Sequence, residues 1–83
     1  MTLDLFEEPY RITISNPSAA DGARIGLLLG LIREIRAMIG IVLIEDGRII
    51  ELNTAYFTVD FRYDVGSDRW RDVNEPVDGE TDQ

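Results

Sequence analysis

A chain of 83 residues with sixteen acidic and eight basic residues, a net charge of −8, and neither cysteine nor histidine excludes several classes of function. The length predicts one domain, the missing cysteine excludes disulfides and thiolate metal sites, and the missing histidine removes the commonest general base and zinc ligand. We therefore expect no enzyme, no cofactor and no metal.

The acidic balance also narrows the choice of partner. Phosphate backbones and anionic membrane surfaces attract basic patches, so we expect neither direct nucleic-acid binding nor membrane binding. All eight basic residues are arginine, and one interpretation is that a GC-rich genome or a high-salt cytoplasm sets this composition. The other is an acidic decoy that occupies a nucleic-acid site on another protein. Met1–Asp4 lacks the regions of a signal peptide, which favours a cytoplasmic protein.

The chain opens with an acidic lead-in, residues 1–9, that Pro9 keeps extended. Residues 10–15 then alternate apolar and polar side chains, with Ile12 and Ile14 on the apolar side. This alternation, rich in β-branched residues, predicts a half-buried strand.

The stretch from Pro17 to Gly40 predicts the only long helix. Asn16-Pro17-Ser18 is typical of a helix start, and Gly40 suits a left-handed cap at its end. At about 100° per residue, the apolar side chains between Ile25 and Ile39 cover an arc of roughly 200°, about twice that of a helix lying on a single core.

The remaining face of this predicted helix carries small residues and one arginine. Its members are Gly22, Gly26, Gly30, Arg33 and Ala37. One interpretation is a weak first half that a nearby loop approaches closely; the other is a bare backbone strip against which a second copy or a partner packs. Glycine costs roughly 1 kcal/mol relative to alanine inside a helix. A membrane span is excluded because the apolar run 25–32 is far shorter than the roughly 20 residues required.

Strands follow the predicted helix to the end of the domain. The apolar run 41–44 and the segment 48–52 flank Asp46-Gly47, which predicts a hairpin with a type I′ turn. Residues 56–65 alternate clearly and predict a long strand with an aromatic inner face. After a turn at 66–68, residues 69–73 are a candidate short fifth strand.

These elements predict an α+β fold in the order β-α-β-β-β, with one helix packed on a mainly antiparallel sheet. We expect residues 1–73 to form the single small domain and residues 74–83 to form an acidic disordered tail. The strand order within the sheet stays open.

A second group of candidate partner-binding residues lies near the C-terminal strands. It consists of Asp60, Asp64, Asp68, Trp70 and Asp72. The Cα atoms of Asp60 and Asp64 would be roughly 13 Å apart on one strand, too far for a shared-proton pair. Trp70, between two arginines, either closes the core or contacts a partner.

We expect a non-enzymatic acidic protein that binds and blocks a macromolecular partner, as inhibitors of host defence, nucleic-acid mimics and antitoxins do. The partner would be a protein, with a basic nucleic-acid-binding surface as one option, and the chain is expected to form a homodimer. The alternative is a structural subunit or obligate homodimer with no inhibitory role.

Overall fold

Six antiparallel strands in a single sheet account for most of the computed structural model, which describes residues 2–74. The elements are β1 (Thr2–Ile14), η1 (Pro17–Ala20), β2 (Ile25–Arg33), β3 (Met38–Ile44), β4 (Ile49–Asn53), η2 (Thr54–Tyr56), β5 (Phe57–Asp64) and β6 (Arg69–Asp72). Both η elements are single 3₁₀ turns, and no α-helix occurs among the described residues.

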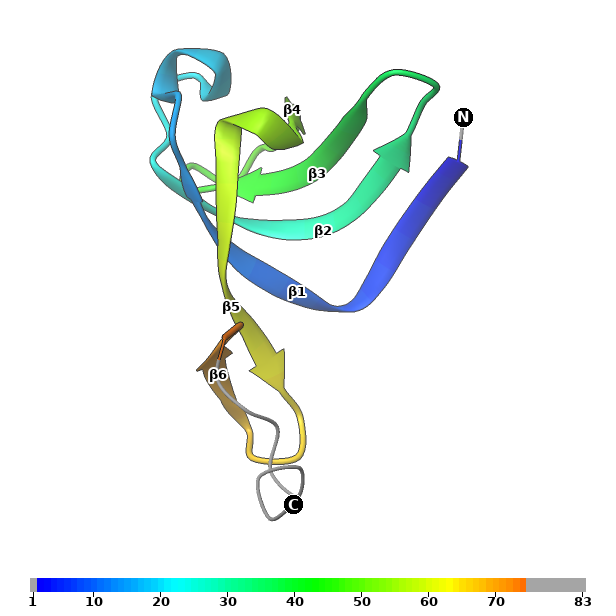
Figure 1. Cartoon of the computed structure of the whole chain (residues 1–83). Helices are drawn as coiled ribbons and strands as arrows, with labels where there is room; N and C mark the ends of the chain where they lie inside the picture. Colours follow the sequence, from blue (N-terminus) through cyan, green and yellow to red (C-terminus); the bar gives the residue numbers. More distant parts are fainter. Residues whose placement is uncertain (1, 75–83) are drawn as a thin grey trace.

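The strand order is β4-β3-β2-β1-β5-β6. Strands β1 to β4 therefore meander, and η2 then carries the chain across the open end so that β5 pairs with β1. Strands β1, β2 and β3 bend along their length and lie as nested curves, with η1 and η2 above their inner side (Figure 1). The β5–β6 hairpin projects away from this curled part of the sheet.

The predicted helix at 17–40 is wrong, and with it the α+β class. Only Pro17–Ala20 is helical, and the rest forms a turn followed by β2 and the start of β3. Between β2 and β3, the Glu34 N–H donates to the Ala37 carbonyl over 2.9 Å, and Ile35 at the tip is fully exposed. The wide apolar arc arose because β2 and β3 carry apolar side chains on both faces, a pattern that a buried helix shares.

The glycines of residues 17–40 help to explain why this segment forms strands and not a helix. A Cβ added at Gly30 would lie 2.5 Å from the Asp4 carbonyl oxygen, and one added at Gly40 would lie 2.9 Å from the Phe57 ring. At Gly30 the backbone of the neighbouring strand β1 leaves no room for a side chain, and at Gly40 the side chains of Leu28 and Phe57 would have to shift. In a helix the same glycines would only weaken the segment, whereas in this sheet they are required.

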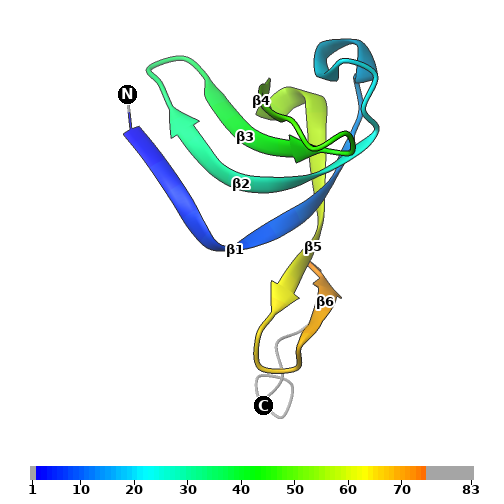
Figure 2. The same cartoon turned by 180° about the vertical axis from the view of Figure 1, so that it is seen from behind.

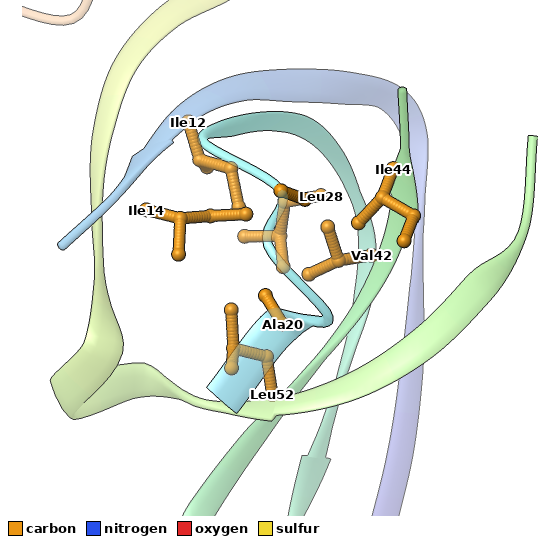
Figure 3. Packing of buried hydrophobic residues seen from close by; sticks show 8 residues of the cluster. Ile12, Ile14, Ala20, Leu28, Val42, Ile44 and Leu52 are labelled. Atoms are coloured by element: carbon orange, nitrogen blue, oxygen red, sulfur yellow. The ribbon is translucent and has the colours of Figure 1, made fainter. Parts of the chain in front are cut away.

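The core lies inside the curl (Figure 3). Its largest fully buried side chains are Ile12, Val42 and Leu52, which come from β1, β3 and β4. Ala20 of η1 has no exposed surface and lies beside Leu52 in the core cluster (Figure 3). Deleting any of the three large side chains would leave a cavity at a cost of about 2–5 kcal/mol.

The predicted strands outside 17–40 agree with β1, β4, β5 and β6 to within a few residues, except that β1 extends back to Thr2. The β3–β4 connection differs from the predicted type I′ turn, because Gly47 has a φ of 92° while Asp46 is not left-handed. The Gly47 N–H donates to the Ile44 carbonyl and Ile44 pairs with Arg48, a three-residue loop that ends on a left-handed glycine. The predicted disordered tail lies outside the described residues, apart from Asn74.

Candidate functional site

The sheet has two apolar faces. Its inner face closes on the core, and an antiparallel sheet of this kind would ordinarily present a polar face to water on the other side. Here the outer face is largely aliphatic instead. By register and alternation it carries Leu3, Leu5, Ile25, Leu27, Ile32, Ile39, Ile41, Leu43 and Ile49.

One row of outer side chains runs across the sheet from β4 to β5. In register, Ile49 lies opposite Leu43, Leu43 opposite Leu27, and Leu27 opposite Arg11, which in turn lies opposite Phe61. We call these five residues the outer row. Direct cross-strand neighbours of this kind stabilise a sheet, but those on its outer face remain half-exposed until a further layer covers them.

A groove of about 300 Å³ opens along the outer row. The side chains that line it come from β1, β2, β3 and β5: Arg11, Thr13, Ile25, Leu27, Leu43, Asp60 and Phe61, with Glu45 at one end. A β-bulge in β5 contributes to this shape. Since Arg11 pairs with Phe61 and Ile12 with Val59, Asp60 is the extra residue, and a bulge turns its side chain toward the groove beside Phe61.

The groove is apolar at its floor and acidic at two places on its rim. Asp60 accepts a hydrogen bond from the Thr13 hydroxyl. Glu45 accepts one from the Arg24 N–H over 2.9 Å and a longer one from the Ile25 N–H over 3.4 Å. These bonds fix both carboxylates while leaving oxygen atoms able to accept from a partner.

Arg11 connects the groove to an aromatic cluster on the β5–β6 hairpin. Its guanidinium lies 5.5 Å from the centre of the Phe61 ring and 5.8 Å from that of Trp70. Trp70 also meets Tyr63 edge to face, with centroids 5.4 Å apart. Trp70 is therefore half-buried beside the outer row and is no member of the inner core.

The predicted acidic residues divide into two groups. Asp60 lies in the groove, whereas Asp64 and Asp68 make hydrogen bonds within the β5–β6 hairpin and Asp72 makes one just after it. Asp64 accepts from Arg71 over 2.5 Å and from the Ser67 hydroxyl over 2.9 Å. Those bonds, that of Ser67 first, hold the pKa of Asp64 below its usual value.

The other two carboxylates are also engaged in local hydrogen bonds. Asp68 accepts from the Tyr63 hydroxyl, and this bond raises the pKa of Tyr63. Asp72 accepts from the Asn74 N–H over 2.8 Å. Their first role is thus local structure, and whether they also meet a partner stays a prediction.

The predicted glycine strip is dispersed. Its members Gly22, Gly26, Gly30, Arg33 and Ala37 share no face, because they fall in the η1–β2 turn, in β2 and in the β2–β3 turn. Gly30 is buried under Leu5 and cannot offer bare backbone to a partner. Arg33 pairs with Asp4 over 3.2 Å at the end of β2.

Sequence reasoning missed the outer row. The signal was present in the near-continuous apolar runs of β2 and β3, which are typical of strands covered on both faces. Among residues 2–74 no group of acidic side chains is placed to hold a metal ion, and no helix is long and apolar enough to cross a membrane. No family model, curated protein or solved structure matches the chain.

Proposed function

We propose that this chain is a non-enzymatic, acidic interaction protein of the cytoplasm that binds a protein partner through the groove along the outer row. The observation that supports this most strongly is the second apolar face of a sheet whose first face already encloses the core. Aliphatic side chains in such numbers outside a core mark an interaction surface.

The groove defines the chemistry of the partner. Its floor of Leu27, Leu43 and Phe61 accepts apolar side chains. The carboxylates of Asp60 and Glu45 on its rim, within a chain of net charge −8, favour arginine or lysine beside them. A partner that normally binds nucleic acid presents such basic residues, and steric blocking of its site would make the chain an inhibitor.

Site-specific photo-cross-linking tests this proposal. A photoreactive phenylalanine analogue replaces Leu27, in the groove, or Ser18, which is exposed on η1 away from it. In cells of the native host we expect one discrete heterologous adduct from position 27 and none from position 18. Equal labelling of both positions, or of neither, would contradict binding through the groove.

The same cross-linker separates the alternative of a structural subunit that only self-associates. If a second copy covers the groove, purified chain alone forms dimer adducts from position 27 at high yield. If a basic partner occupies it, purified chain forms none, and the heterologous adduct weakens with added salt because rim charges are screened. An adduct unchanged by salt would exclude the mimicry of nucleic acid.

A further inference from the structure

The N-terminal half of β1 is an open sheet edge. β1 pairs with β2 at residues 2–5 and again at 10–13, but it pairs with β5 only at residues 10–14. On the β5 side, residues 2–9 therefore have no strand beside them in the described chain. Figures 1 and 2 show this half of β1 swinging away from β5. An extended edge of this kind is a template for pairing with another strand.

The protection of this edge against pairing is concentrated at Glu7, Glu8 and Pro9, so that residues 2–6 are the part best able to pair. Leu3 and Leu5 point to the outer face and are 55% and 68% exposed. Asp4, on the inner face, is a charge that would ordinarily discourage pairing, but its ion pair with Arg33 neutralises it. Pro9 ends the segment that is free to pair.

We propose that two copies of this chain pair antiparallel along residues 2–6 of β1, so that their sheets become continuous. A twofold axis normal to the sheet keeps the two inner faces on the same side, and it must lie midway between the two copies of one residue. With the axis at Asp4, Leu3 of each copy lies opposite Leu5 of the other on the outer face, and the two Asp4 side chains, each paired with Arg33 of its own copy, lie opposite each other on the inner face. With the axis at Leu5, Leu3 would lie opposite the charged Glu7. The first register is therefore favoured.

The charges beyond the paired segment are complementary in the same arrangement. Among the described residues, Glu7 and Glu8 make no ion pair, and Arg36 is exposed in the β2–β3 turn next to the other end of the segment. Antiparallel pairing brings the Glu7–Glu8 end of one copy toward the turn of the second copy. Two such contacts per dimer offset part of the repulsion between chains of net charge −8.

This inference does not depend on the proposed function, because the edge lies on β1 and the groove on the outer row. The test is light scattering on the purified full chain at about 100 μM, together with amide exchange of residues 3–5 at high and low concentration. We expect a dimer, and exchange that slows with concentration. A monomer at this concentration, or exchange independent of it, would overturn the proposal.

Paired variants locate the contact. Leu3→Glu with Leu5→Glu should weaken the dimer by more than about tenfold, because it places charges opposite one another along the shared edge. The matched control is Ile49→Glu, which changes a 61% exposed residue on the edge strand β4 and should leave the dimer intact. Dissociation by the control, with a stable dimer in the β1 variant, would place the interface elsewhere.

A charge swap tests the register. Glu7→Arg should weaken the dimer about fivefold through two lost ion pairs, and adding Arg36→Glu should restore it. Both positions are exposed, so circular dichroism should show unchanged folding. A double variant that dimerises no better than Glu7→Arg would contradict the predicted register.

Discussion

At Gly40, in β3, the side chains of Leu28 and Phe57 approach so closely that an added Cβ would force them to shift. A Cβ there would lie 2.8 Å from Leu28 Cδ1 and 2.9 Å from two atoms of the Phe57 ring. We expect Gly40→Ala to lower the free energy of unfolding by about 1–3 kcal/mol, because the partly buried Phe57 ring must shift. Urea unfolding measures this. The control Gly66→Ala, whose new Cβ would meet only Asp64 Oδ1 at 3.4 Å, should change stability little.

The carboxyl of Asp64 couples stability to pH. Its pKa is lowered from 3.8 in the folded chain, first by the Ser67 hydroxyl and then by Arg71. A lowered folded pKa means that the stabilising contribution is present above the unfolded pKa and is lost as the pH falls through the folded value. The stability difference between the wild type and Asp64→Asn should therefore be constant near neutral pH and shrink below about pH 4. Thermal unfolding followed by Trp70 fluorescence measures it, and a difference that stays constant down to pH 2 would contradict this assignment.

Among the elements, sequence pattern predicted those strands that are polar on one face. Residues 57–64 of β5 and 49–53 of β4 alternate or follow a turn signal, and both form where expected. β2 was missed, and β3 was predicted only over residues 41–44, because strands with apolar residues on both faces lack the alternation of apolar and polar side chains. Asp60 and Trp70 were predicted as partner contacts and do flank the outer row. Leu27, Leu43 and Phe61 were not, since only the register of four strands brings them together.

Whether Gly30→Ala stabilises or destabilises the protein distinguishes a strand from a helix at residues 25–33. In a helix, Gly30→Ala would stabilise by about 1 kcal/mol. In β2 the new Cβ would lie 2.5 Å from the backbone oxygen of Asp4, so we expect destabilisation and loosened pairing of β1 with β2. Ala37→Gly is the companion measurement. It would cost about 1 kcal/mol inside a helix, but little in the β2–β3 turn. Stabilisation by Gly30→Ala would contradict the strand.

For the whole molecule, the proposed function assigns stability to the inner face of the sheet and partner binding to the outer face. The inner face is complete within one chain, since Ile12, Val42 and Leu52 are each at most 2% exposed. The outer row is incomplete, since its aliphatic side chains are covered by no element among the described residues. A net charge of −8 opposes aggregation through this face, so the net charge and the apolar surface are both compatible with the proposed interaction protein.

Leu27 and Leu28 are adjacent in β2 and test this division directly. Leu28 points inward and is 3% exposed, so Leu28→Ala should lower the free energy of unfolding by about 2–5 kcal/mol. Leu27 points into the outer groove, so Leu27→Ala should lower the free energy of unfolding clearly less, because its side chain is only half-buried in the free chain.

Partner binding should respond to the two substitutions in the reverse order. It is followed as the photo-cross-linked adduct from a neighbouring groove position such as Thr13. Leu27→Ala should reduce the adduct, whereas Leu28→Ala should retain it at temperatures where the variant stays folded. If both substitutions cost the same stability and neither changes the adduct, the outer face serves only the fold and carries no partner.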